Sequence, residues 1–270
     1  MRIKTKTLMA ALLAIAGLVL GHAPAGAVLT QADGDIFIGF RDTTSKNAYL
    51  INLGSYTQFT GLAPGGTLTF GTLNADLTTQ FGGSWDATST TFWGAFGSYQ
   101  PGGTSIYVSR ARTLASPNTP ATAWTPITNS SGDRGIVDTA ISAVRGGFVN
   151  NLTTTAATVA NSGFQSGATG TGKYYPAVNA SPDFSSVGTW TSIEGSFATA
   201  PKALDLFVLN NTGANGSTTR LGAFTIDGSA GVNRGVVTFT AVPEPSTYML
   251  MALAGTIFMV FIRRRRALQN

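Results

Sequence analysis

Short apolar runs separated by turn-forming residues recur along most of this chain, and they limit its possible folds more than any other feature. The runs are rich in β-branched and aromatic side chains, and clusters of Gly, Ser, Thr, Asn and Pro stand between them. They span residues 35–40, 49–53, 67–73, 91–96, 105–109, 203–210, 221–226 and 235–242. This pattern predicts a mainly β fold with a β-sandwich or jelly-roll-like core, and not a parallel α/β sheet.

One stretch has a helical pattern instead. Apolar residues recur three or four positions apart between Ile136 and Asn150, which places them on one face of a helix. These residues are Val137, Ile141, Val144 and Phe148. We therefore expect one helix packed on the β framework. The Gly- and Ser-rich residues 161–173 lack any such pattern, and we expect them to be disordered.

The chain has no cysteine and a single histidine, His22. The lack of cysteine excludes disulfides, thiolate metal sites and cysteine nucleophiles. His22 lies in a segment that we expect to be removed, so the mature protein would lack the histidine of a Ser-His-Asp triad or of a zinc site. We expect no metal site and no cofactor.

The positive net charge of the chain lies at its two ends. The formal charge is +5, but residues 28–241 hold ten basic and eleven acidic side chains, which leaves that part at −1. A basic surface that binds nucleic acid is therefore not expected. The polar surface implied by abundant Thr, Ser, Gly and Asn suits contact with carbohydrate.

The first 27 residues have the three parts of a secretory signal peptide. A basic start is followed by an apolar run from Leu8 to Leu20, which is short for a membrane span. Ala25 and Ala27 provide small residues at the two positions that signal peptidase reads. We predict a signal helix that enters the Sec translocon and is removed by signal peptidase after Ala27.

The last 29 residues form a second signal, at 242–270. Pro243, Glu244 and Pro245 favour an extended backbone that neither a helix nor a sheet absorbs. The apolar run 248–262 then predicts a single transmembrane helix, although its rise of about 22 Å is less than the ~30 Å of the hydrocarbon core. Basic side chains that follow can snorkel and hold the C-terminus on the cytoplasmic side. They are Arg263, Arg264, Arg265 and Arg266.

This ending resembles the PEP-CTERM sorting domain, in which V-P-E-P, an apolar stretch and a basic cluster follow one another. The resemblance implies that an exosortase, a membrane-embedded, transpeptidase-like cysteine protease, recognises Pro243, Glu244 and Pro245 as substrate residues. It also implies export by a Gram-negative bacterium that makes exopolysaccharide, with a place in the biofilm matrix. The alternative interpretation is an ordinary stop-transfer anchor after a proline-containing linker.

Three segments follow from these signals: a signal peptide at 1–27, a β-rich extracytoplasmic domain at 28–241 and a sorting tail at 242–270. The opening of the central domain, with GFRD and YLINLG in residues 35–54, also resembles the start of other exported PEP-CTERM proteins. That likeness implies a shared β-rich fold and brings no active-site motif with it.

Few residues of the central domain suggest chemistry. Asp33 and Asp35 flank a glycine and offer carboxylate oxygens to a calcium ion, but no EF-hand spacing follows, and a turn before the first strand explains them better. Asp133 and Asp138 lie near the start of the predicted helix. We expect Asp133 to stabilise the helix N-terminus and not to bind a metal ion. Residues 163–172 repeat glycine without the lysine of a P-loop.

A sugar-cleaving site would need two facing carboxylates, and Glu194 is the only glutamate of the central domain. Four tryptophans can either stack on sugar rings or pack in a β core, and packing is the more common use. They are Trp85, Trp93, Trp124 and Trp190.

Our leading hypothesis is an exported, non-enzymatic surface or matrix protein associated with exopolysaccharide, which passes through a transient inner-membrane intermediate. The alternatives are a secreted polysaccharide-modifying enzyme and a permanently anchored envelope protein.

Overall fold

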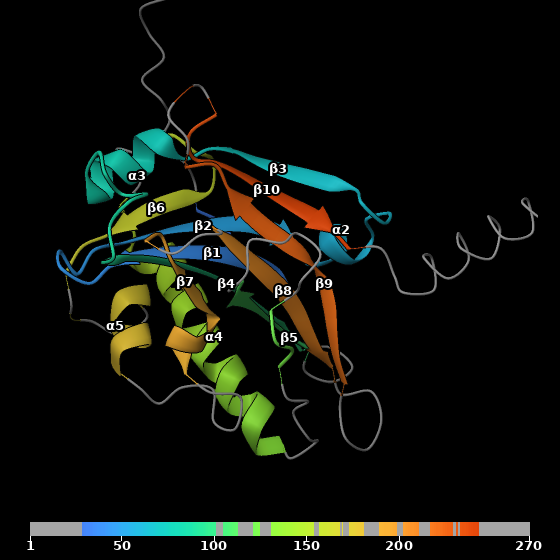
Figure 1. Cartoon of the computed structure of the whole chain (residues 1–270). Helices are drawn as coiled ribbons and strands as arrows, with labels where there is room; N and C mark the ends of the chain where they lie inside the picture. The colour runs from blue at the N-terminus through green and yellow to red at the C-terminus, as the bar shows by residue number, and fades with distance from the viewer. Residues whose placement is uncertain are drawn as a thin grey trace, which may run out of the picture.

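The structure is a computed structural model, and it describes residues 29–100, 105–112, 121–124, 131–153, 157–167, 169, 173–180, 189–198, 202–210, 217–228, 231 and 233–242. Within these ranges the chain is mainly β, as the sequence predicts (Figure 1). The predicted signal helix at 1–27 and the predicted transmembrane helix at 248–262 lie outside the described residues.

Eight of the ten described strands correspond to the predicted apolar runs, whereas β6 and β7 were not predicted. They are β1 (Asp35–Asp42), β2 (Ala48–Ser55), β3 (Thr67–Thr72), β4 (Thr91–Tyr99), β5 (Ser105–Ala111), β6 (Ser162–Gln165), β7 (Glu194–Ser196), β8 (Ala203–Asn210), β9 (Ser217–Ile226) and β10 (Val236–Ala241). The helices are α2 (Thr57–Thr60), α3 (Asn74–Phe81), α4 (Ser131–Asn151) and α5 (Tyr174–Ala180), with a 3₁₀ turn, η2 (Trp190–Ile193).

All ten strands belong to one curled antiparallel sheet, where the sequence predicted a sandwich or jelly roll. The strand order is β3-β10-β9-β8-β5-β4-β1-β2-β6, and β7 pairs with β4. Irregular pairing between Leu206 and Phe207 interrupts the β8–β9 ladder, and such irregularities bend and twist a sheet. The two halves of the sheet therefore face each other across a core, as two sheets would in a sandwich.

This inner core is lined by residues from both halves of the sheet. Ile36, Ile38 and Phe40 of β1 contribute from one side, and Val237 and Phe239 of β10 from the other. The α2 helix closes the core with a buried phenylalanine whose ring lies 5.1 Å from that of Phe239.

A second apolar core lies on the other face of the sheet, between the sheet and the helices α4 and α5. Both helices lie on that face in Figure 1. Phe37 of β1 points into it, between neighbours that point into the inner core. Because both faces are covered, all eight residues of β1 are buried. At Gly39 the missing side chain leaves room for the Tyr174 ring, which a Cβ would meet at 2.6 Å.

The predicted helix is confirmed as α4, which begins at Ser131, earlier than expected. Its predicted apolar face is fully buried: Val137, Ile141, Val144 and Phe148. The expectation of a single helix is wrong for the described residues, since α2, α3 and α5 are also helical. These helices have only four, eight and seven residues, too few for a helical period to stand out.

The expectation of disorder at residues 161–173 is wrong for its first part. Ser162–Gln165 forms β6, whose four residues are buried and pair with β2. Leu152 packs closely over Gly163, where a Cβ would lie 2.8 Å from it. Tertiary packing therefore fixes a segment whose own composition gives little support to a strand.

Close packing between β9 and β10 provides a stability prediction. A Cβ at Gly222 would overlap the Phe239 ring and the backbone oxygen of Thr240. We expect Gly222→Ala to lower the free energy of unfolding by about 1–3 kcal/mol, because this backbone cannot move aside cheaply. Gly83→Ala enters open space and should change it by less than about 0.5 kcal/mol in the same urea titration. Equal effects of the two changes would refute the argument.

Candidate functional site

Threonine side chains cover the outer side of the sheet edge formed by β3, β10 and β9. Strand alternation explains them, because Phe224, Val237 and Phe239 point into the inner core and the residues between them point outward. We call this surface the threonine face, and it comprises Thr67, Thr69, Thr225, Thr238 and Thr240. Four of these residues are exposed, and Thr238 is half-buried.

Strand register arranges the hydroxyls in rows. Thr238 lies opposite Thr69 of β3 on one side and opposite Thr225 of β9 on the other, and Thr240 lies opposite Thr67. Neighbouring strands are about 4.8 Å apart, so the face repeats donors and acceptors at short intervals.

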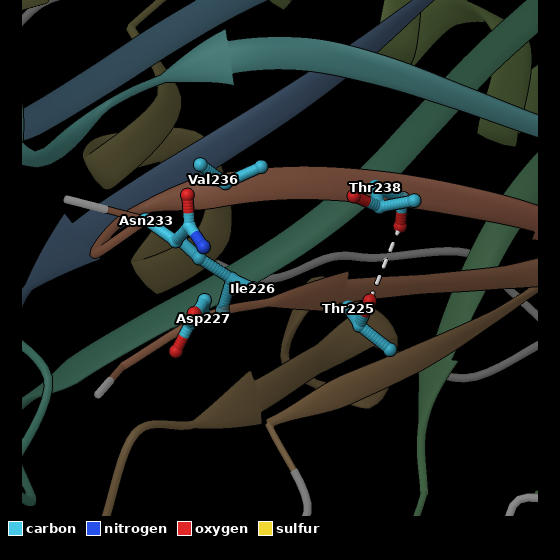
Figure 2. A pocket seen from close by; sticks show the side chains of 6 residues that line it. All are labelled: Thr225, Ile226, Asp227, Asn233, Val236 and Thr238. Carbon is cyan, nitrogen blue, oxygen red and sulfur yellow. Dashed lines mark hydrogen bonds between the residues drawn. The ribbon is translucent and has the colours of Figure 1, made fainter. Parts of the chain in front are cut away.

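An open pocket of about 360 Å³ lies at the hairpin end of this face (Figure 2). It is lined by Thr225, Ile226, Asp227, Asn233, Val236 and Thr238. Asp227 and Asn233 come from the β9–β10 turn, and the threonines from the strands. A carboxylate, an amide and hydroxyls can together bind the paired hydroxyls of a polar, uncharged ligand. The volume falls within the usual range of ligand pockets.

An ion pair links the same turn to the segment that follows α3. The Nη2 atom of Arg234 lies 2.7 Å from Oδ1 of Asp86, and its guanidinium lies over the Trp85 ring at 5.3 Å. Lys202 donates to the backbone oxygen of Asp86. Burial acts to raise the pKa of Asp86, but its hydrogen bonds and the positive charges of Arg234 and Lys202 together hold the pKa below its usual value. These charges hold the turn in place.

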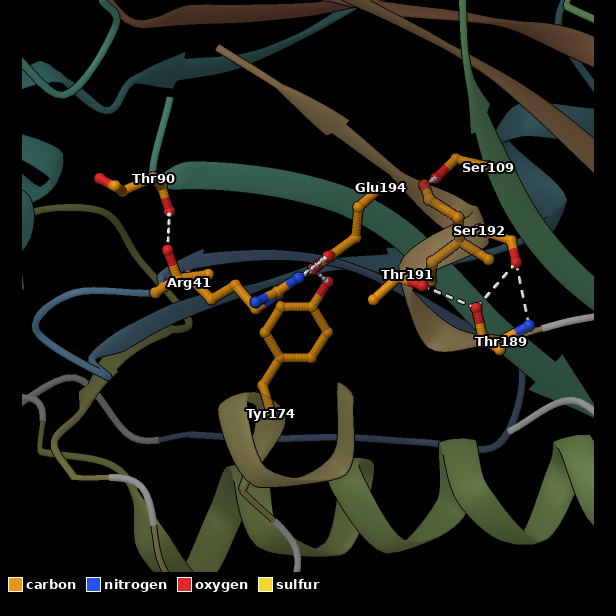
Figure 3. Close-up of polar contacts among 10 residues, drawn as sticks. Arg41, Thr90, Ser109, Tyr174, Thr189, Thr191, Ser192 and Glu194 are labelled. Atoms are coloured by element: carbon orange, nitrogen blue, oxygen red, sulfur yellow. Dashed lines mark hydrogen bonds and ion pairs between the residues drawn. The ribbon is translucent and has the colours of Figure 1, made fainter. Parts of the chain in front are cut away.

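A polar cluster of Arg41, Tyr174 and Glu194 is buried between the sheet and α5 (Figure 3). Arg41 of β1 donates from Nε and Nη2 to both oxygens of Glu194, at 2.6–2.9 Å. The Tyr174 hydroxyl donates to Oε1 of Glu194 at 2.8 Å. Burial raises the pKa of Glu194 above its usual value, against the opposing effect of Arg41 and Tyr174. Both carboxylate oxygens are thus engaged inside the protein.

Other buried carboxylates are engaged in the same way. Asp205 of β8 accepts hydrogen bonds from Arg112 at 2.7 Å, from Arg220 at 2.6 Å and from the backbone N–H of Ala121 at 2.6 Å. Asp76 of α3 accepts a hydrogen bond from the Tyr49 hydroxyl at 2.5 Å. It also accepts hydrogen bonds from the hydroxyl and the backbone N–H of Thr158. These carboxylates fasten distant segments together.

The paired aspartates lie at a turn that leads into β1, as the sequence predicts, and Asp35 is the first residue of the strand. Gly34 between them has a φ of 87°. Asp35 accepts from the backbone N–H of Ala32 and from Asn52, both at 2.7 Å. Asp33 forms an ion pair with Arg145 at 3.0 Å. Across the described ranges, no group of three or more His, Asp and Glu side chains is placed to hold a metal ion.

The remaining candidates have structural surroundings. All four tryptophans are at most 2% exposed, so the packing interpretation is confirmed: Trp85, Trp93, Trp124 and Trp190. Asp138 lies inside α4 and accepts a hydrogen bond from Gln100. Asp133 lies in the first turn of that helix. Within 163–172, the first three residues belong to β6.

Sequence reasoning missed the pocket and the Arg41–Glu194 pair. The alternation of threonine with apolar residues in TLTF and TFTA indicated an outward polar face on two strands. Pairing between those two strands, β3 and β10, is nonlocal. The turn between β9 and β10 is local, but its sequence does not show that Asp227 and Asn233 line a pocket with the threonines. No local signal links Arg41 with a glutamate 153 residues away.

The predicted targeting residues lie outside the described residues. They are Ala25 and Ala27 of the signal cleavage site, Pro243, Glu244 and Pro245 of the recognition motif, and Arg263, Arg264, Arg265 and Arg266 of the basic cluster. Val242, just before the motif, is the last described residue.

A family model described as the PEP-CTERM protein-sorting motif matches residues 241–266. The chain carries a PEP-CTERM sorting motif. The predicted resemblance is thereby confirmed, and the matched range includes both the recognition residues and the arginines. The motif indicates an exported protein that is handled at the membrane and sorted by an exosortase, a membrane protease.

Other comparisons add no relative. No curated protein and no solved structure matches the chain. Over the part of the chain that the structure describes, no helix has the length and apolar character needed to cross a membrane.

Proposed function

We propose that this exosortase substrate is a non-enzymatic surface or extracellular matrix protein whose β domain binds exopolysaccharide through the threonine face. The observation that carries the proposal is the pocket of about 360 Å³ at the end of that face. Its lining combines Asp227, Asn233 and threonine hydroxyls, groups that hydrogen-bond sugar hydroxyls without requiring charge on the polymer.

The non-enzymatic part of the proposal is supported by the way the buried carboxylates are used. Glycoside hydrolysis needs an acid and a base or nucleophile that face the scissile bond. Glu194, Asp205 and Asp76 instead accept hydrogen bonds from arginine, tyrosine or backbone groups. These carboxylates therefore stabilise the fold.

The targeting part of the proposal is a signal peptide at 1–27, removed after Ala27, and a tail whose apolar run 248–262 spans the inner membrane before processing. The four arginines keep the C-terminus cytoplasmic. After processing, the domain reaches the cell surface or the extracellular matrix.

Co-sedimentation with the producing organism's own exopolysaccharide tests the binding site. We expect the mature protein to bind, and we expect Thr225→Val combined with Asn233→Ala to weaken binding about tenfold, since each lost hydrogen bond costs about 0.5–1.5 kcal/mol. The control pair, Thr78→Val and Thr79→Val, lies on the exposed side of α3 and should bind normally.

Two results would change the conclusion. If the unaltered protein does not bind the polymer, polysaccharide binding is refuted. If it releases reducing sugar from the polymer, the second candidate, a secreted polysaccharide-modifying enzyme, replaces the proposal.

A further inference from the structure

The last strand of the domain runs directly into the sorting motif. The backbone N–H of Ala241 donates to the oxygen of Gly66 at 2.9 Å, and the N–H of Gly65 donates to the oxygen of Ala241 at 3.1 Å. The N–H of Val242 donates to the oxygen of Leu221 at 3.2 Å. Val242 is therefore held by the sheet, and the next residue is the first proline of the motif.

No residue separates Val242, the last residue bonded to the sheet, from Pro243, the first of the residues that exosortase is expected to recognise. An extended chain spans at most about 3.6 Å per residue, so Pro245 lies within about 11 Å of Val242. Tyr248, where the apolar run begins, lies within about 22 Å of Val242. A membrane protease that holds the motif must therefore come close to the end of the sheet from which the tail leaves.

The surface at this end is formed by residues 61–66, which connect α2 to β3, and we call it the tail-exit surface. Its sequence is GLAPGG, and four of these six residues are exposed. It carries no charge, so bringing it against a protein or lipid surface removes no ion from water. Leu221, which accepts the hydrogen bond from Val242, follows a charged residue, Arg220. The charge of Arg220 is paired with Asp205 at 2.6 Å.

We propose that the tail-exit surface is the face with which the folded domain contacts exosortase while the sorting motif is processed. The threonine pocket lies at the opposite end of β10, about five strand residues or roughly 17 Å away. The pocket and the tail-exit surface therefore lie at different ends of the same strand. The inference rests on sorting by exosortase and does not depend on polysaccharide binding.

Site-specific cross-linking tests the contact, because the chain has no cysteine of its own. In the full-length chain, Ala63→Cys places one thiol on the tail-exit surface, and a thiol-reactive benzophenone can be attached there. Ile136→Cys is the matched control, since Ile136 is 45% exposed on α4. In membranes of the producing cells, we expect the label at position 63 to capture exosortase several-fold more often than the label at position 136.

Insertion of about twelve Gly and Ser residues between Val242 and Pro243 provides the second measurement. The tether to the apolar run becomes about three times longer, so the effective concentration of the surface should fall about fivefold, and the cross-link with it. Pro64→Cys serves as an independent label position if Ala63→Cys disturbs folding.

The outcomes separate this inference from the functions already proposed. A processed tail with equal cross-linking from positions 63 and 136, or with a yield unchanged by the insertion, overturns the tail-exit contact and leaves sorting intact. An unprocessed tail in every variant refutes both the contact and sorting. Neither result bears on whether the domain binds polysaccharide.

Discussion

Arg41→Met is expected to lower the free energy of unfolding by about 3–5 kcal/mol, because removal of one partner leaves a buried charge uncompensated. The side chain of Glu194 is fully buried, and Arg41 donates to both of its oxygens. In the variant only the Tyr174 hydroxyl remains as a donor to Glu194 among the contacts described above. Urea unfolding of the purified domain measures the loss.

The pH dependence distinguishes this electrostatic cost from a packing defect. Burial already raises the pKa of Glu194, and without Arg41 it should rise further. A carboxyl whose folded-state pKa is raised favours the folded state below its unfolded pKa, and this contribution is lost as pH rises through the folded pKa. The deficit of Arg41→Met should therefore be largest near neutral pH and shrink toward pH of about 4, where the glutamate is protonated.

Two further variants test the same pair. Arg145→Met breaks the partly exposed pair with Asp33, whose carboxylate side chain is 36% exposed, and should cost less than about 1 kcal/mol. Arg41→Met combined with Glu194→Met should recover much of the loss, because no unpaired buried charge remains. A deficit independent of pH, or one as large in Arg145→Met, would contradict the interpretation.

The strands were predictable because each is specified by its own residues. In β1, the consecutive apolar residues Ile36, Phe37 and Ile38 are typical of a strand buried on both faces. A run of this kind can be recognised from the local sequence, without knowledge of the partner strands. By contrast β6 contains one large apolar residue, Phe164, and it exists because β2 supplies its hydrogen bonds. The closure of the strands into one curled sheet is likewise a property of pairing, which no single segment encodes.

The candidate site also has features that the local sequence predicts and features that depend on contacts between distant residues. The threonine face follows from alternation within β3 and β10, but its pocket depends on the turn that carries Asp227 and Asn233. The partnership of Arg41 with Glu194 joins strands far apart in sequence, so composition revealed only that Glu194 was a lone glutamate in the domain. The sorting motif was predictable in full, because its recognition depends on consecutive residues and not on a fold.

Changing Pro243, Glu244 and Pro245 together to alanine is expected to abolish processing of the tail. The matched motif at residues 241–266 includes all three residues, and proline restricts the backbone angles in a way that favours an extended segment, as a protease substrate needs. Alanine removes both the fixed backbone angles and the carboxylate, and it favours a helix that would continue from the apolar run. We expect the unaltered protein to lose the segment after Pro245 and the variant to retain it.

Intact mass of the protein from cells and from medium measures this difference directly. Thr247→Ala, just beyond the recognition residues, is the matched control and should be processed as the unaltered chain is. Because Val242 is bonded to Leu221, the sheet should fold equally in all three proteins, and equal urea midpoints would show that a retained tail does not reflect misfolding. An intact tail in the unaltered protein as well would make this chain a permanently anchored envelope protein, since an uncut apolar run followed by four arginines remains in the membrane.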